Sequence, residues 1–424
     1  MRGLLAVVPR GKETPGARPA LESMSHRAWR GFAQIKGDIS IFGALNNNGF
    51  NVNHGFIHGE IYSDDMSGLL GELIGDPSPK TSKELLQLDG SFAFVAPYKK
   101  GLIFGRDSLG TKPLYYGKSR ICFALASEKK PLGTLGIQSI ESVPPSSVFL
   151  FNGKSLQKIA SYDYLRGLKH RNKDDSDELL SILRVSVKRR VKSKVAVSFS
   201  GGVDSSLLAS MASEFSKILA VSVHTDVSHD ANAPRSAAKA LGLDLLEVGI
   251  TEKDIHEKIP WIQKIAEATS PTDTSIALGM MFASQAARKE GYDTMLVGQL
   301  ADEIFGGYER YLKSYCSDRA SSVRRMMKHD VMTAHSLNFD RDEKATSPFV
   351  DLCLPYASVE LVRFGLSIKP ELEFDCAKKE RKTALRNAAK KFRIPAEIAE
   401  RPKKAFQYSS GISRAVMRYM RRTS

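Results

Sequence analysis

Between residues 194 and 315 the chain alternates continuous apolar runs with segments of helical spacing. The runs VAVSF, ILAVSVHT, LDLLEVGI and TMLVG suit strands that are buried on both faces, as in a parallel sheet. Helices are predicted between these runs, near 252–268 and 274–290, and a further helix over 301–315. Strand–helix alternation at this spacing predicts an α/β fold with a doubly wound parallel sheet, whose ligands bind beyond the carboxyl ends of the strands.

The preceding part of the chain has a different pattern, in which short apolar runs alternate with Gly, Asp and Lys-Gly turn signals, as in antiparallel strands. Residues 168–177, LKHRNKDDSD, are polar and charged, and we place a domain boundary there. Two domains, 1–166 and 175–424, agree with a length of 424 residues, which exceeds what one hydrophobic core usually holds. A helix is predicted after the boundary, with an apolar stripe of Leu179, Leu180, Leu183, Val187 and Val191.

Composition places the chain among ordinary globular proteins, with 42% hydrophobic and 26% charged residues. No stretch approaches the roughly 18 consecutive apolar residues of a membrane span, and no secretory cleavage site follows the opening MRGLLAVVPRG. We therefore expect a cytoplasmic protein with no membrane contact. The cysteines Cys122, Cys316, Cys353 and Cys376 are scattered without a CxxC pair, so we predict neither a disulfide framework nor a zinc site.

The positive charge is concentrated near the C-terminus. From Lys378 to Ser424 the chain has 15 Lys or Arg residues and 3 Glu, which leaves +12 of the formal +15 in this segment. Such a segment needs an anionic partner, of which polyphosphate and nucleic acid are two, or it forms the solvated face of a helix.

The segment SFSGGVDSS, residues 198–206, joins a predicted strand to a predicted helix. Its glycines allow a tight turn, and the free N–H groups and dipole of the helix start favour phosphate oxygens. An aspartate among phosphate donors suits a bound divalent cation. A plain strand–helix turn is the alternative. The residues that we predict to bind the phosphates are Ser200, Gly201, Gly202, Val203, Asp204 and Ser205.

These residues and a second motif carry a resemblance to a known family. SGGVDS is similar to the PP-loop of ATP pyrophosphatases, and LVGQLADEIFGGYERY resembles the asparagine synthetase B segment SGEGSDExxxGY. The resemblance implies that Asp204 and Asp302 hold Mg²⁺ against the pyrophosphate of ATP. The alternative for Asp302 is a helix start, where an acidic residue favours the dipole.

Further matches extend the resemblance toward the C-terminus. RPKKAFQYSSG stands in the place of the family's RxKxxF segment, and KTALR resembles its KxxLR stretch. The resemblance implies that Lys403 contacts pyrophosphate and that Lys382 also belongs to the catalytic site. An ammonium there stabilises charge that develops on phosphate oxygens. We therefore prefer this role for the basic segment and do not expect nucleic acid as a partner.

The N-terminal half resembles the glutaminase domain of class II amidotransferases through LDGSFAFV, GRDSLGTKPLYYG and ASEKKPL, which implies an αββα sandwich. It departs from that family where the chemistry occurs. Arg2 stands in place of the nucleophilic cysteine, only His26 and Arg27 remain of HRGPD, and NGEIYN reads HGEIYS with His58. Loss of one oxyanion donor alone costs about 10²–10³ in rate. We predict that this domain does not hydrolyse glutamine.

The synthetase half also departs from its family. Gln299 replaces a glutamate that is thought to assist the attacking amine, and Asp351 and Cys353 replace a Glu and an Arg of the aspartate-binding segment. We assign Gln299, Asp351 and Cys353 to the acceptor pocket. Because a carboxylate-clamping arginine is lost there, the use of ATP is better supported than the identity of the acceptor.

The sequence therefore predicts an ATP- and Mg²⁺-dependent ligase that adenylates a small carboxylate, aspartate by family analogy, and forms an amide, with adenine near Val223 and Gly298. The nitrogen would come from ammonia or a separate glutaminase. Two alternatives remain: a related ligase with another acceptor, as in β-lactam synthetase, and a non-catalytic nucleotide-binding scaffold. A homodimer is an open alternative to a monomer.

Overall fold

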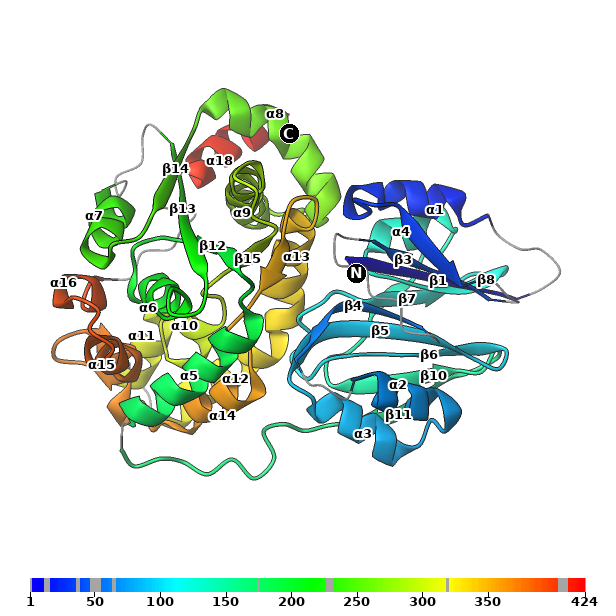
Figure 1. Ribbon diagram of the computed structural model, residues 1–424, viewed down its shortest axis with the longest axis horizontal. Coiled ribbons are helices and arrows are strands. Elements are labelled where there is room, and N and C mark those ends of the chain that lie inside the picture. The colour runs from blue at the N-terminus through cyan, green and yellow to red at the C-terminus, as the bar shows by residue number, and fades with distance from the viewer. Residues whose placement is uncertain are drawn as a thin grey trace. The chain divides into compact units, whose positions relative to one another are not determined.

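The computed structural model describes residues 2–10, 16–35, 39–45, 55–62, 66–173, 175–225, 232–317, 320–402 and 411–423. The chain divides into two compact units, Met1–Tyr164 and Leu165–Ser424 (Figure 1). No helix in the described part of the chain is both long and apolar enough to span a membrane.

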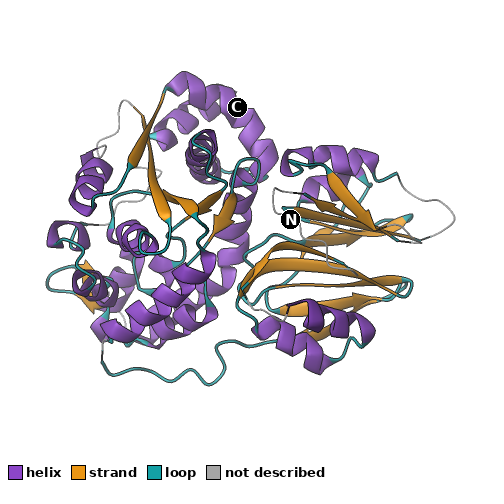
Figure 2. Ribbon diagram, viewed as in Figure 1, coloured by secondary structure: helices purple, strands orange, loops and turns teal. Residues whose placement is uncertain are grey.

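The N-terminal unit consists of two antiparallel sheets between two layers of helices (Figure 2). The first sheet has the order β2-β3-β1-β8-β7-β9, with β1 (Gly3–Pro9), β2 (Phe32–Ile35), β3 (Ser40–Ala44), β7 (Tyr115–Lys118), β8 (Cys122–Ala126) and β9 (Ile140–Ser142). The second has the order β11-β10-β6-β5-β4, with β4 (Phe56–Ile61), β5 (Gly90–Tyr98), β6 (Gly101–Arg106), β10 (Ser147–Phe151) and β11 (Leu156–Ser161). Helices α1 (Arg18–Ser23) and α4 (Lys129–Thr134) pack on the first sheet, and α2 (Met66–Gly75) and α3 (Pro79–Gln87) on the second. The expected αββα sandwich is confirmed.

Strand β1 of this antiparallel unit is apolar on both faces, because each face belongs to a different core. Leu4, Ala6 and Val8 belong to the core between the two sheets. The alternate residues Leu5 and Val7 belong to the core under α1 and α4. Because successive side chains of a strand point to opposite faces, a strand in a four-layer sandwich must be apolar at every position.

The C-terminal unit is built on a parallel five-stranded sheet with the order β14-β13-β12-β15-β16. The strands are β12 (Lys194–Ser198), β13 (Lys217–Thr225), β14 (Leu245–Ile250), β15 (Thr294–Leu296) and β16 (Asp351–Cys353). Helices α6 (Val203–Ala212) and α9 (Pro271–Lys289) pack against its strands. The predicted doubly wound sheet is confirmed, with the additional edge strand β16 that the sequence pattern did not indicate.

Further helices complete this unit. They are α5 (Ser176–Arg190), α7 (Asn232–Leu241), α8 (Glu252–Ala266), α12 (Ala320–Ala334), a π-helical turn (His335–Phe339), α13 (Asp340–Thr346), α14 (Val359–Ser367), the 3₁₀ helix η3 (Pro370–Leu372), α15 (Thr383–Lys391), α16 (Ala396–Ala399) and α18 (Ile412–Thr423). A short hairpin, β17 (Phe374–Asp375) and β18 (Glu380–Arg381), precedes α15.

The single helix predicted over 301–315 is wrong. The chain forms two helices there, α10 (Ala301–Ile304) and α11 (Glu309–Ser317). Gly306 separates them with a φ of +69°, a left-handed conformation that breaks a helix and that glycine adopts without a steric penalty. Apolar spacing continues across the break, and for that reason the sequence pattern did not reveal it.

The prediction that the cysteines form no disulfide is also wrong. Cys316 at the end of α11 is bonded to Cys376 in the β17–β18 hairpin, with a Cα–Cα distance of 5.8 Å. The two residues are 60 positions apart in the chain, so their pairing depends on tertiary structure and not on a local motif. The bond ties α11 to the hairpin that leads into Lys382.

The double substitution of Cys316 and Cys376 by serine should lower the free energy of unfolding of the C-terminal unit by about 2–4 kcal/mol, because the closed loop restricts the unfolded chain. In a Trp29→Phe background, Trp261 in α8 reports unfolding of this unit in urea by its fluorescence. A reducing agent should destabilise the wild type to the same level and leave the double variant unchanged. If the wild type and the double variant, each with and without the reducing agent, all have the same free energy of unfolding, the bond has no structural role.

Candidate functional site

The site lies where the strand order of the parallel sheet reverses. The chain runs from β12 outward to β13 and β14 and then returns to place β15 on the other side of β12. The loops after Ser198 and after Leu296 therefore leave adjacent strands at the carboxyl edge of the sheet. Open α/β sheets bind ligands at this point, because the two loops diverge and leave a crevice between them.

The loop after β12 has the geometry of a phosphate cradle. Gly201 has a φ of +69°, and a Cβ there would lie 2.5 Å from the carbonyl oxygen of Ala233, so only glycine fits. The hydroxyl oxygens of Ser200 and Ser205 are 3.2 Å apart, which closes the loop over the start of α6 at Gly202 and Val203. The first N–H groups of this helix have no partner within the helix and are suited to phosphate oxygens.

The two predicted carboxylates converge on one ammonium group. Lys382 Nζ lies 2.6 Å from Asp204 Oδ1 and 2.7 Å from Asp302 Oδ1. Asp204 belongs to the first turn of α6 and Asp302 to that of α10, whereas Lys382 directly precedes α15. A cation therefore occupies the point between the two carboxylates.

This pair of carboxylates fits a magnesium ion. Magnesium in nucleotide sites is usually held by one or two carboxylates together with substrate phosphates, and it keeps several waters. Asp204 and Asp302 supply two such oxygens beside the phosphate cradle. Within the described ranges, no cluster of three or more His, Cys, Asp and Glu side chains forms a complete protein cage for a metal.

Gly307 keeps the space between these groups open. A Cβ at this position would lie 1.8 Å from Asp302 Oδ1 and 2.2 Å from Lys382 Cε. Gly307→Ala should therefore displace Asp302 or Lys382 and weaken Mg·ATP binding by about 100-fold, which corresponds to about 2.7 kcal/mol. Gly249→Ala is the matched control, because a Cβ there meets no atom within 4 Å. Isothermal titration of both variants checks this, and equal affinities would contradict the assignment.

A cavity of about 530 Å³ opens beside the carboxylates. Of the predicted residues, it is lined by Ser200, Asp204, Ser205, Gly298, Gln299 and Asp302. The structure places Val223 on β13 and Asp351 and Cys353 on β16, and these residues are not part of the lining. Lys403 lies outside the described residues.

The acidic side of this cavity includes Glu303, next to Asp302. Its carboxylate accepts hydrogen bonds from Tyr308 Oη at 2.8 Å and from Asn338 Nδ2 at 3.0 Å, and the residue is 3% exposed. Burial, together with the negative charge of Asp302, raises the pKa of Glu303 to about 7. Asp204 and Asp302, by contrast, each lie within 2.7 Å of the Lys382 ammonium group.

Gln299 joins a charged network on another wall of the cavity. Its side-chain amide donates to Asp342 Oδ2, while Asp342 Oδ1 accepts from Arg341 Nε at 2.7 Å. Arg341 also donates to Asp273 Oδ1 at 2.9 Å. Burial raises the pKa of Asp342, and the Arg341 guanidinium opposes this rise. A carboxylate is therefore present beside Gln299, although position 299 itself has none.

Sequence reasoning missed residues that hold this site in place. The fully buried Tyr356 donates from its hydroxyl to the Asp204 carbonyl at 3.1 Å. Arg401 Nη1 donates to the carbonyls of Gly201 and Ala233, each at 3.1 Å. Arg401 begins the RPKKAF motif, which drew attention to its lysine, and Asp342 and Tyr356 lie in the 341–358 segment that resembles the family's aspartate-binding segment, in which neither was assigned a role.

In the N-terminal unit, Arg2 stands at the position where the sequence resemblance implies a nucleophilic cysteine. It is 2% exposed, and its guanidinium stacks on the Trp29 ring. Arg27 donates to the Arg2 carbonyl at 2.6 Å and also to Glu128, which lies 2.8 Å from His26 Nε2.

His58 is also buried in this unit, and its Nδ1 is 3.2 Å from Ser127 Oγ. The one cysteine in the sequence of this unit, Cys122, is buried in β8. Burial raises the pKa of the Cys122 thiol, which opposes thiolate formation.

Comparisons with known proteins identify the family of this chain. The family model of asparagine synthase matches residues 178–347 and 317–423, and that of a glutamine amidotransferase domain matches residues 74–134. A Methanocaldococcus jannaschii protein, named among the glutamine-hydrolysing asparagine synthetases, is 30% identical over 385 residues, which is 78% of this chain and 70% of that protein. Asparagine synthetase B of Escherichia coli is 25% identical, over 77% of this chain and 62% of its own length.

The glutamine-hydrolysing asparagine synthetase 3 of Arabidopsis thaliana is 27% identical, again over 77% of this chain, and the match covers 60% of that protein. The chain thus spans between 60% and 70% of these three relatives. The asparagine synthase model covers more than half of the chain, and the match to the Methanocaldococcus jannaschii protein at 30% identity covers more than two thirds of that protein. This chain therefore belongs to the asparagine synthase family.

Proposed function

We propose that this protein adenylates a small carboxylate with Mg·ATP, releasing pyrophosphate, and then forms an amide with ammonia. Membership of the asparagine synthase family makes it an ATP-dependent carbon–nitrogen ligase by class. The observation that carries the proposal is the convergence of Asp204 and Asp302 on one cation position beside the loop after β12. By the names of its relatives, the carboxylate is aspartate and the product asparagine.

The chain's own groups account for the first half-reaction. The amide N–H groups at the start of α6 and the hydroxyls of Ser200 and Ser205 bind the β- and γ-phosphates. Asp204 and Asp302 would hold Mg²⁺, which neutralises phosphate charge when bound. A substrate carboxylate oxygen attacks the α-phosphorus, and the bond to pyrophosphate breaks. Lys382 lies where it stabilises the charge that develops on the leaving oxygens.

In the second half-reaction an amine attacks the acyl carbon, and AMP leaves with the electron pair of the broken C–O bond. The attacking nitrogen must lose a proton, which the side-chain amide of Gln299 cannot accept, so the proton passes to solvent water. We infer that the nitrogen donor is free ammonia or ammonia from another protein. The buried Arg2, the buried His58 and the inaccessible thiol of Cys122 support the inference that the N-terminal unit does not hydrolyse glutamine.

Purified protein with ATP, Mg²⁺, aspartate and ammonium should release pyrophosphate and form asparagine, and glutamine in place of ammonium should give no asparagine. Asparagine formation from glutamine would refute the inactive-glutaminase inference alone. Pyrophosphate release without asparagine would remove aspartate as acceptor. ATP binding without any turnover would support a nucleotide-binding scaffold instead.

A ligase that acts on another carboxylate is the second candidate. The observation that favours it is the wall of the cavity around Arg341, whose guanidinium is already bonded to Asp342 and Asp273. An α-carboxylate of aspartate would have to compete with these two carboxylates for the same donors. A panel of carboxylic acids, each assayed for pyrophosphate release, distinguishes the two candidates.

A further inference from the structure

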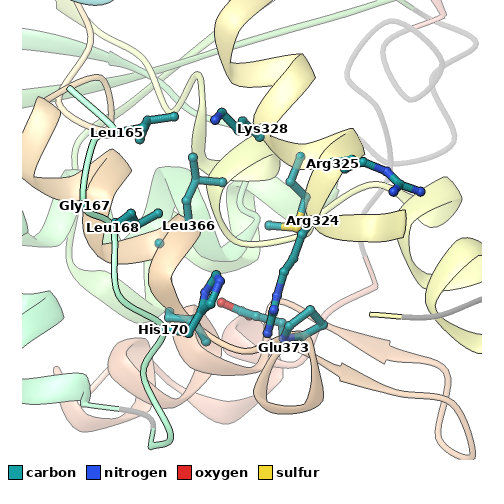
Figure 3. Close-up of a pocket in the computed structure, with 13 residues that line it drawn as sticks. Leu165, Gly167, Leu168, His170, Arg324, Arg325, Lys328, Leu366 and Glu373 are labelled. Atoms are coloured by element: carbon teal, nitrogen blue, oxygen red, sulfur yellow. The ribbon is translucent and has the colours of Figure 1, made fainter. Parts of the chain in front are cut away.

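A second pocket of the C-terminal unit lies between α12, the end of α14 and the segment 165–170 (Figure 3). Its volume is about 390 Å³, within the range of about 300–1,000 Å³ that small-molecule sites occupy. It shares no lining residue with the cavity beside Asp204 and Asp302. The apolar part of its lining consists of Leu165, Leu168, Met327, Leu366, Ile368 and Pro370.

One helix adds a cluster of positive charge to this apolar lining. Arg324, Arg325 and Lys328 of α12 line the pocket, and the described residues provide no carboxylate that forms an ion pair with any of the three. Against these three cations the lining has one carboxylate, Glu373. Like charges four positions apart on a helix destabilise it, so local helix stability does not explain Arg324 and Lys328.

The hydrogen bonding of Arg324 is incomplete, which is a second observation that favours an anionic ligand. Its Nε is buried and has no hydrogen-bond partner in the described part of the chain. In Figure 3 the Arg324 side chain extends from α12 toward the Glu373 end of the pocket, where the His170 ring also lies, whereas Arg325 points away. A buried guanidinium N–H without an acceptor is costly, and an anionic ligand that bonds the same guanidinium would offset that cost by a charge-assisted hydrogen bond.

We propose that this pocket binds a small anion with an apolar body, such as a carboxylate or a phosphate monoester on an aliphatic or aromatic group. The apolar lining accepts the body of the ligand, and Arg324 holds its charged end at the Glu373 end of the pocket. A ligand of this class contacts both the apolar lining and the Arg324 guanidinium, whereas an uncharged apolar molecule supplies no acceptor to that guanidinium.

The pocket is connected to the catalytic site through Glu373, which is 1% exposed. Its carboxylate accepts the Ala384 N–H at 3.4 Å, and its carbonyl accepts the Thr383 hydroxyl at 3.2 Å. These contacts fix the start of α15, directly after Lys382. A ligand at the Glu373 end therefore acts on the segment that places Lys382 against Asp204 and Asp302, and the site is an effector site. This coupling rests on the proposed function, but the binding does not.

The binding is tested with 8-anilinonaphthalene-1-sulfonate (ANS), a fluorescent anion with an apolar two-ring body. Octanoate should displace ANS. 1-Octanol has the apolar chain without the charge, and inorganic phosphate has the charge without an apolar body. Each of these two should therefore need a concentration at least about tenfold higher than octanoate to displace ANS. Equal displacement by octanoate and octanol would overturn the anion specificity, and equal displacement by octanoate and phosphate would overturn the role of the apolar lining.

Two variants locate the ANS site. Arg324→Gln should weaken ANS binding about ten- to hundredfold, since a charge-assisted hydrogen bond to the ligand is lost, and Leu168→Trp should abolish binding by filling the pocket while keeping every charge. Arg421→Gln on the exposed face of α18 removes the same charge elsewhere and should change the affinity less than twofold. Unchanged binding in both pocket variants would place ANS elsewhere and overturn the proposal.

The coupling is tested by adding Mg·ATP to the ANS titration. The affinity for ANS should change at least about fivefold, and ANS should change the affinity for Mg·ATP by the same factor. If Mg·ATP binds but changes the affinity for ANS by no measurable factor, the effector role is wrong. If Mg·ATP does not bind at all, the proposed function fails, while the ANS titrations still decide the pocket.

Discussion

Asp204→Asn and Asp302→Asn should each reduce pyrophosphate release at least about 10³-fold, which corresponds to about 4 kcal/mol of transition-state stabilisation. Each substitution keeps the shape of the side chain and removes one of the two charges that face the cation position. A neutral amide oxygen binds Mg²⁺ and polarised phosphates far less strongly than a carboxylate. Initial rates of pyrophosphate release at saturating ATP check this expectation.

The matched control is Asp244→Asn, which removes a carboxylate from an exposed position of the same unit. It should leave the rate within twofold of the wild type. Thermal unfolding of all three variants separates loss of chemistry from loss of fold. If Asp204→Asn and Asp302→Asn retain wild-type rates while they remain folded, the assigned site is wrong.

Glu128→Gln should lower the free energy of unfolding of the N-terminal unit by about 3–5 kcal/mol, because it breaks a buried ion pair and leaves its cationic partner buried. Glu128 is fully buried, in contact with Arg27 and 2.7 Å from Lys130 Nζ. Trp29, on which Arg2 stacks, reports this unfolding in a Trp261→Phe background, since the chain has two tryptophans. Denaturation in urea measures the change.

The effect of Glu128→Gln should depend on pH. Burial alone would raise the pKa of Glu128, but Arg27, with His26 and Lys130, outweighs it and holds the pKa well below the usual value. The stabilisation is therefore fully present above the unfolded-state pKa of about 4.3 and is lost as the pH falls through the lower folded-state pKa. The gap in stability between the wild type and Glu128→Gln should be constant near neutral pH and should narrow below about pH 4.

Glu22→Gln provides the comparison for an exposed pair. Glu22 lies 2.9 Å from Arg18 on α1, with side chains that are 65% and 89% exposed. Solvent screens such a pair, and the substitution should change the stability by at most about 0.5 kcal/mol. A similar effect of Glu22→Gln and Glu128→Gln would show that burial does not govern the contribution of Glu128.

Several features of the fold and the site could be predicted because their causes are local. Continuous apolar runs predicted β12 and β13, and the Ser-Gly-Gly-Val-Asp-Ser segment predicted the turn into α6. The rule that loops at a strand-order reversal meet at one edge, together with the family resemblance, placed Asp204 and Asp302 in one site. The structure brings these two carboxylates to the same ammonium group.

Other features depend on contacts between distant parts of the chain. Lys382 reaches Asp204 across 178 residues, and Gln299 reaches Asp342 across 43, so no periodicity or spacing signals either pair. The break between α10 and α11 escaped prediction because apolar spacing continued through Gly306. The Cys316–Cys376 bond escaped it because scattered cysteines reveal a pair only when the fold brings them together.

The sequence by itself determined the kinds of elements, their order and the chemistry available at each loop, because backbone preference and side-chain type act over a few residues. Only the tertiary structure decided which polar groups meet: Lys382 with two carboxylates, Asp342 with Gln299, and Arg324 of α12 with one apolar pocket. Electrostatic and hydrogen-bond interactions depend on distance in space and on burial, and both are set when the helices pack on the sheet.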